Sequence, residues 1–462
     1  MMPEIERLVE KAESLGAEFA EVRWQRVEST RLVVVDGTLR ELNTGVREGF
    51  GIRAFVGGAW GFSTVHGGDE SAAMRAVEEA VRLASAASKL KSERFKMGGE
   101  PSTGTWETRA RMDPREVDIS QKIDFTVELN DSARAVDQRV KNVNVAYVDT
   151  VSQERVANTL GTRVSQEIVR TRAAVQIFAH EAGTTERAFE SVGGLGGFEV
   201  VQTDKALAMG EEAARRAVDL LSAKSAPAGP FKAILDPKLA GVFIHEAFGH
   251  ACEADEVLAK MSILEGRIGE RVGREIVNVS DDPTLPGLYG SYAFDSEGSR
   301  ARKKHLVREG VLTSFMHNLE TASRMGTVST GNGRATDYSH PPVVRMSNTF
   351  IEPGDWGVEE MFAEVRDGIY AVGSLYGYTD PAKGEFVFKA EGGWRIKNGE
   401  RVERLREVAI TGTILEILHN ISAVGRDLQF DPGHCGKFGQ WVPVTTGSPH
   451  ILVERVVFGG MR

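Results

Sequence analysis

The residues best suited to chemistry are two histidines and a glutamate in one short segment. His245, Glu246 and His250 form the pattern His-Glu-x-x-x-His. In the shorter pattern His-Glu-x-x-His, two imidazoles lie one helical turn apart and bind zinc, and the glutamate acts as general base. The segment therefore indicates a metal-dependent hydrolase. The alternative is an amphipathic helix whose histidines form hydrogen bonds within a core.

The additional residue between the histidines has a structural consequence. Asp236 and Pro237 mark a helix start, because aspartate caps helices and proline suits their first position. In a regular helix, five residues leave two side chains about 140° apart, so both could not reach one ion. A π-bulge absorbs one extra residue. We therefore expect the helix to deform at about 247–250, near Gly249, and to bring His245 and His250 together.

A catalytic zinc site needs three protein ligands and one open position. The sequence offers five candidates for the third ligand: Cys252, His340, His419, His434 and Cys435. Cys435 has the best context, because the surrounding glycines allow close backbone approach and Lys437 could lower the pKa of the thiol. A buried cysteine without a function is the alternative.

Other polar residues near these candidates could assist. Glu253 and Asp255 could orient ligand imidazoles through the ring nitrogen that does not bind metal, or they could form a solvated helix end. Tyr338, His340 and Arg345 are further candidates, for stabilising an oxyanion.

Composition excludes several classes of protein. The 462 residues carry 66 acidic and 56 basic side chains, a net charge of -10, which argues against nucleic acid or an anionic membrane as the main partner. No apolar stretch is long enough for a membrane helix, and the first residues do not resemble a secretory signal. Two cysteines exclude a disulfide scaffold and favour the cytoplasm.

The hydrophobic pattern predicts an α+β fold of two domains with mainly antiparallel sheets. Strands are expected around an Asp36-Gly37 hairpin turn, before and after Gly57-Gly58, and over 142–180. Helices are expected over 3–15, 69–88, 113–137 and 203–221. The small and proline-containing segment 222–230 predicts a boundary between an N-terminal domain, 1–225, and a C-terminal domain, 226–462, which carries the metal site.

Two motifs resemble the TldD/PmbA family of intracellular metallopeptidases. His245 to Asp255 is similar to that family's signature helix, and Gly433 to Gln440 is similar to its glycine-rich cysteine motif. The stretches 331–334 and 341–349 are also similar. The resemblance implies that His245, His250 and Cys435 bind Zn²⁺ and that Glu246 is the general base. It further implies two α+β domains and a homodimer, or a heterodimer with a homologous TldE/PmbA-type subunit that lacks the zinc motif.

The expected function is hydrolysis of unstructured or extended peptides by water that zinc activates, with the peptide bound as an added strand. Two alternatives remain: a non-catalytic binding or modulator protein with a structural metal, and a zinc hydrolase of non-peptide amides.

Overall fold

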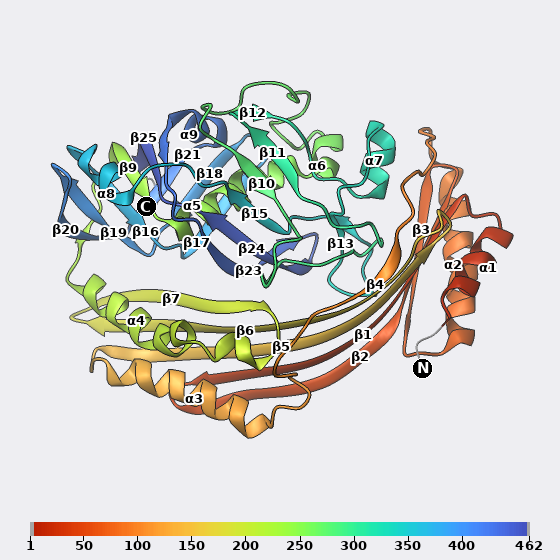
Figure 1. Ribbon diagram of the computed structural model, residues 1–462, viewed down its shortest axis with the longest axis horizontal. Coiled ribbons are helices and arrows are strands. Elements are labelled where there is room, and N and C mark those ends of the chain that lie inside the picture. Colours follow the sequence, from red (N-terminus) through yellow and green to blue (C-terminus); the bar gives the residue numbers. More distant parts are fainter. Residues whose placement is uncertain (1–3, 460–462) are drawn as a thin grey trace.

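The computed structural model describes residues 4–459, and its N-terminal half is built on one long, curved sheet (Figure 1). The strand order is β3-β2-β1-β5-β6, and β6 pairs on its outer side with β4 and β7. The strands are β1 (Phe19–Val35), β2 (Thr38–Val56), β3 (Ala59–His66), β4 (Thr103–Glu107), β5 (Val140–Asn158), β6 (Arg163–Glu181) and β7 (Thr184–Leu195). The expected hairpins form: Asp36 and Gly37 both have positive φ, as a two-residue turn requires.

Within the part of the chain that the structure describes, four α-helices pack against this sheet. They are α1 (Glu6–Ser14), α2 (Glu70–Ser88), α3 (Ile119–Ala135) and α4 (Asp204–Leu221). In Figure 1, α3 and α4 cover the convex face, while α1 and α2 lie at the other end of the sheet. The first helix was expected from Pro3, which lies outside the described residues. The helix expected from 113 begins later, because Asp113 binds Arg115 and the cap is Asp118, which accepts from the backbone N–H of Ser120.

The C-terminal half lies over the concave face of the long sheet and contains two larger sheets (Figure 1). The six-stranded sheet has the order β12-β11-β10-β15-β24-β23. Its strands are β10 (Val279–Asp281), β11 (Lys304–Arg308), β12 (Val311–Leu312), β15 (Asn348–Ile351), β23 (Gln429–Lys437) and β24 (Gln440–Ser448). A separate pair is β13 (Gly333–Arg334) with β14 (Val343–Val344).

The ten-stranded sheet has the order β17-β18-β21-β25-β9-β16-β19-β20-β8, with β22 beside β25. Its strands are β8 (Lys224–Ser225), β9 (Gly229–Leu235), β16 (Asp367–Val372), β17 (Tyr376–Asp380), β18 (Glu385–Lys389), β19 (Gly392–Lys397), β20 (Glu400–Arg406), β21 (Ala409–Thr413), β22 (Ile421–Val424) and β25 (Ile451–Phe458). The helices of this half are α5 (Pro237–Phe243), α6 (Ala254–Leu258), α7 (Leu319–Met325), α8 (Val358–Ala363) and α9 (Ile414–Asn420).

The fold is therefore α+β with mainly antiparallel sheets, as predicted. Helix α5 lies between the two larger C-terminal sheets and contacts β24 of one and β16 of the other. Its apolar side chains join a single core with strands of both sheets. The segment 222–230 follows α4 and contains β8 and the first two residues of β9, and the division at 225/226 stays a prediction. No helix within residues 4–459 is both long and apolar enough to cross a membrane.

A buried ion-pair network joins the curved sheet to the C-terminal half. Arg53 of β2 donates from Nη2 to Glu21 on the neighbouring strand and to Glu297, each at 2.8 Å. All three side chains are buried. Removing one member of a buried pair leaves uncompensated charge, which costs far more than the loss of an exposed pair.

We expect Arg53→Met to lower the free energy of unfolding by about 3–5 kcal/mol, because Glu21 and Glu297 then remain buried without a cation. Urea unfolding followed by circular dichroism measures the change. Arg82→Met is the matched control, since Arg82 pairs with Glu79 at 2.6 Å with both side chains largely exposed. An Arg53 variant as stable as the Arg82 variant would contradict this account.

Candidate metal centre

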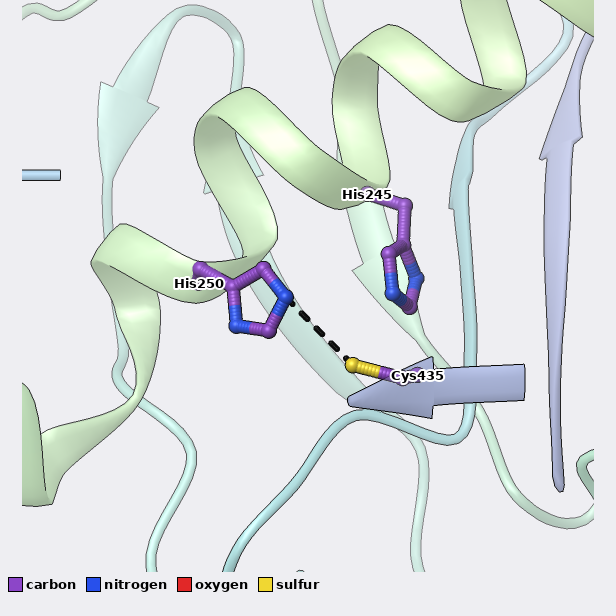
Figure 2. A group of neighbouring side chains, drawn as sticks. All are labelled: His245, His250 and Cys435. Atoms are coloured by element: carbon purple, nitrogen blue, oxygen red, sulfur yellow. Dashed lines mark hydrogen bonds between the residues drawn. The ribbon is translucent and has the colours of Figure 1, made fainter. Parts of the chain in front are cut away.

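A wide helical turn places both motif histidines on one side of the helix. Asp236 caps α5 by accepting from the backbone N–H of Leu239 at 2.8 Å. The helix then widens into a π-helical turn over Ile244–Gly249, in which the N–H of His250 donates to the carbonyl of His245. Because this bond spans five residues, the two imidazoles face the same side, with ring centroids 5.6 Å apart (Figure 2). The expected deformation is confirmed, and it begins earlier, at Ile244.

Gly249 permits the packing of this turn rather than an unusual backbone conformation. Its φ of -60° is ordinary for a helix. A Cβ at this position would lie 2.1 Å from Sδ of Met346, which is fully buried. The glycine therefore lets the wide turn approach the segment that leads into β15.

Cys435 reaches the histidines from β23, the terminal strand of the six-stranded sheet. Its Sγ lies 3.3 Å from Nε2 of His250 (Figure 2). One ligand atom from each of His245, His250 and Cys435 lies within 4.8 Å of the others. The guanidinium of Arg345, which is completely buried, donates to the backbone carbonyl of Cys435. The structure thus brings together three residues that the sequence separates by up to 190 positions.

The three side chains fit a metal ion. Both ring nitrogens of His245 are buried and have no hydrogen-bond partner within residues 4–459. A buried polar atom without a partner costs about 1–3 kcal/mol, so such an atom calls for an explanation. Two imidazole nitrogens and a thiolate are a donor set that zinc prefers, and a metal at this position would take one of the His245 nitrogens as ligand.

The charges around the site favour a thiolate. Burial alone would raise the pKa of the Cys435 thiol, but His250 and His245 hold that pKa well below its usual value. Burial likewise opposes charge on His250, yet Cys435 and Glu253 raise the pKa of this imidazole. Glu253 accepts from Nδ1 of His250 at 2.9 Å, which directs Nε2 toward Cys435. This hydrogen bond agrees with the expectation that Glu253 orients the imidazole of a ligand histidine.

Asp255 and Lys437 act differently from the sequence-based expectation. The ammonium of Lys437 lies 3.0 Å from Glu253, 2.8 Å from Asp255 and 3.3 Å from Glu256. These three carboxylates are close enough together to hold a cation, and Lys437 takes that place. Asp255 therefore binds Lys437 rather than an imidazole. The low pKa of the thiol comes from the histidines, and Lys437 fixes the end of β23 to the segment that follows His250.

Glu246 lies on the accessible side of the group. Its side chain is 38% exposed, and Oε2 is 3.7 Å from Nε2 of His250. By contrast, His245 and Cys435 are almost fully buried. A carboxylate that is close to the ligand atoms and also open to solvent can exchange protons with a bound molecule.

The remaining candidates lie elsewhere. Cys252 is part of the apolar core, His419 is exposed at the end of α9, and His434 points to Tyr289, with Nε2 3.3 Å from the tyrosine oxygen. His340 binds Asp337, and the hydroxyl of Tyr338 binds His66 at 2.8 Å. Arg345, named as an oxyanion candidate, instead supports the backbone of Cys435. That role depends on a contact between distant segments and leaves no signal in the local sequence.

Comparison with protein families gives matches over most of the chain. The profiles of the PmbA/TldA metallopeptidase domain 1, central domain and C-terminal domain match residues 20–84, 113–221 and 228–460. The C-terminal profile alone spans half of the chain and includes all four motif residues.

Similar proteins share nearly the full length. A metalloprotease of Methanocaldococcus jannaschii is 37% identical over 95% of this chain and 96% of its own. A zinc metalloprotease TldD homologue of Saccharolobus solfataricus is 28% identical over 98% and 99%. The crystal structure of TldE from Thermococcus kodakarensis has the same fold, with a TM-score of 0.78 at 21% identity, over 99% of this chain and 100% of that one.

Proposed function

The chain belongs to the PmbA/TldA metallopeptidase family, and on that premise we propose that it is a zinc-dependent peptidase that cleaves extended, unstructured peptides. The observation that carries this proposal is the group of His245, His250 and Cys435 with Glu246 open to solvent beside it. A structural zinc site has four protein ligands. This group has three within residues 4–459, which favours a catalytic site over the structural metal of a modulator protein.

In the proposed site, His245, His250 and Cys435 hold the zinc ion. When bound, zinc polarises a carbonyl oxygen and lowers the pKa of water toward neutrality. The protein's own contribution begins with charge: the thiolate of Cys435 and the carboxylate of Glu253, which orients His250, stabilise a cation at this place.

Glu246 moves the proton in this proposal. As a general base it accepts a proton from the attacking water, and as a general acid it delivers that proton to the leaving amine nitrogen. Its position beside His250 and its partial exposure allow both transfers without a change of the helix.

The terminal strand β23 supports an extended substrate. Cys435 lies in this strand, whose strand partner within residues 4–459 is β24 alone. A peptide can bind to the end of a sheet as an added strand, and folded domains cannot adopt that form. We therefore propose that the substrate lies extended beside β23.

We also propose that the active assembly is a dimer, either of this chain or with a TldE/PmbA-type homologue. The shared fold with TldE supports a partner of similar shape. Phe438 and Trp441, at the turn between β23 and β24, are 72% and 63% exposed, and a second chain could cover them. Both cysteines are free, which agrees with the cytoplasm as the proposed location.

We expect Cys435→Ser to lose most of its zinc while the fold remains, because serine is a much weaker zinc ligand than thiolate. Metal analysis after dialysis, together with circular dichroism, measures this. Cys252→Ser is the matched control, since Cys252 is equally buried but does not belong to the group of His245, His250 and Cys435. Full zinc occupancy and activity in Cys435→Ser would exclude Cys435 as a ligand and make His434 the next candidate.

Glu246→Gln is expected to keep zinc and fold and to lower peptide turnover by roughly 10²-fold or more, because the amide cannot accept the proton. Steady-state hydrolysis of an unstructured peptide gives the rate. Glu265→Gln, an exposed substitution of the same kind, should behave as wild type. Near-normal turnover in Glu246→Gln would remove this residue from the mechanism.

We expect the protein to be dimeric and to digest an unfolded protein while leaving the same protein intact when folded, because only an extended chain can lie along β23. Light scattering gives the mass, and electrophoresis follows digestion of both forms. A monomer that degrades the native form as fast as the unfolded one would contradict both expectations. Matched peptides and small amides, assayed in parallel, separate a peptidase from a hydrolase of other amides.

A further inference from the structure

A cavity of about 300 Å³ lies between the concave face of the long sheet and the C-terminal half. Strands β5 and β6 line one wall, and His434 and Pro443 of the paired strands β23 and β24 line the other. Because His434 and Cys435 are consecutive in a strand, their side chains point to opposite faces. The cavity therefore lies on one face of β23, and the proposed metal centre lies on the other.

The side chains of Arg170 and Arg334 line this cavity. Burial lowers the pKa of His434 in the cavity wall, and the charges of Arg172, Arg170 and Arg334 lower it further. Arg170 of β6 donates to the carbonyls of Tyr289 and Ser291, each at 2.8 Å. Arg334 donates to the carbonyls of Met346 and Pro443, at 2.5 and 2.7 Å.

The third guanidinium belongs to Arg172, two residues along β6 from Arg170. Within residues 4–459 its side chain makes no hydrogen bond or ion pair, and its Nε is buried without a partner. Burial raises the pKa of the neighbouring Tyr289 phenol, and the positive charge of Arg172 lowers it.

Anionic groups act on these arginines only weakly: burial lowers the pKa of Arg334 more than the charges of Asp281 and Cys435 raise it. None of the three forms an ion pair with a carboxylate within residues 4–459, although Arg170 and Arg334 are less than a tenth exposed. Burial and the charge of Arg334 lower the pKa of Arg170 to about 10, and burial lowers the pKa of Arg172 as well. Buried cations without an anion are costly, so an arrangement of this kind favours an anionic ligand.

The carboxylates that line the cavity are held by other groups. Glu154 accepts from Gln25 at 2.9 Å and from Gln166 at 3.1 Å, and Asp337 accepts from Ser339 at 2.6 Å. Asp295 accepts from three backbone N–H groups. The charge of Glu154 reaches Arg170, but it is a weaker influence than burial or Arg334.

We propose that Arg170, Arg172 and Arg334 form a subsite that binds a carboxylate of the peptide substrate, from either an acidic side chain or the C-terminus. This inference rests on the proposed function. Neighbouring side chains of an extended peptide point to opposite faces. When one residue of a peptide beside β23 faces the metal centre, the next faces the cavity, whose mouth carries the exposed side chains of Arg47 and Trp441.

The test compares peptides that differ only in a carboxylate. A short unstructured peptide carries Gln or Glu at each position in turn, with either a free or an amidated C-terminus. We expect kcat/KM to be about tenfold higher for one Glu peptide than for its Gln counterpart, or for the free C-terminus than for the amide. The first result assigns the subsite to an acidic side chain, and the second assigns it to the chain end.

Arg172→Gln should reduce that ratio to about one, whereas Arg172→Lys, which keeps the charge, should retain part of it. Arg40→Gln, an exposed substitution far along β2, is the matched control and should keep the wild-type ratio. Thermal unfolding of each variant checks that the fold is intact. A wild-type protein indifferent to every carboxylate, or a preference that survives in Arg172→Gln, would overturn the proposal.

A binding measurement separates this proposal from the peptidase itself. Fluorescence anisotropy with labelled Glu and Gln peptides and the Glu246→Gln protein reports affinity without turnover. If the wild type cleaves no peptide, the proposed function fails, and a tenfold tighter binding of the carboxylate peptide that Arg172→Gln abolishes still supports the subsite. Equal affinity for both peptides would overturn it independently.

Discussion

The proposed centre depends on one backbone hydrogen bond, from the N–H of His250 to the carbonyl of His245. In a regular α-helix the two imidazoles would diverge, and no arrangement of the rest of the protein could bring both to one ion. Around this bond, the Asp236 cap fixes where the helix begins, and the apolar contacts of α5 with two sheets fix its position. The absence of a side chain at Gly249 leaves room for Met346 against the wide turn.

Cys435, the third proposed ligand, comes from the distant strand β23, and charged groups hold that strand in place. Arg345 holds the carbonyl of Cys435, and Lys437 links the end of β23 to the carboxylates that follow His250. Glu253 belongs to both arrangements, because it accepts from His250 and from Lys437. The orientation of one imidazole and the position of the cysteine strand are therefore coupled through a single buried carboxylate.

The contact between the two halves of the chain uses buried arginines in two different ways. Arg53 forms ion pairs with two buried carboxylates, so its charge is compensated and the contact stabilises the fold. Arg170 meets only carbonyl groups and lies beside Arg172 and Arg334, so positive charge accumulates in the cavity next to β23. The same interface thus both fastens the C-terminal half to the long sheet and offers an anionic group a place close to the proposed centre.

The sequence by itself determined the local features: the cap at Asp236, the helices expected over 69–88 and 203–221, the hairpin at Asp36 and Gly37, and the need for a distorted turn between His245 and His250. Each of these follows from interactions among residues a few positions apart, which the sequence contains directly. The glycine-rich context favoured Cys435, but only the tertiary structure decided that this residue joins the histidines, because its distance from His250 depends on where β23 packs. It also decided that Asp255 binds Lys437, that Arg345 supports the backbone of Cys435 and that three arginines gather near His434, since such contacts depend on how segments far apart in the chain pack together.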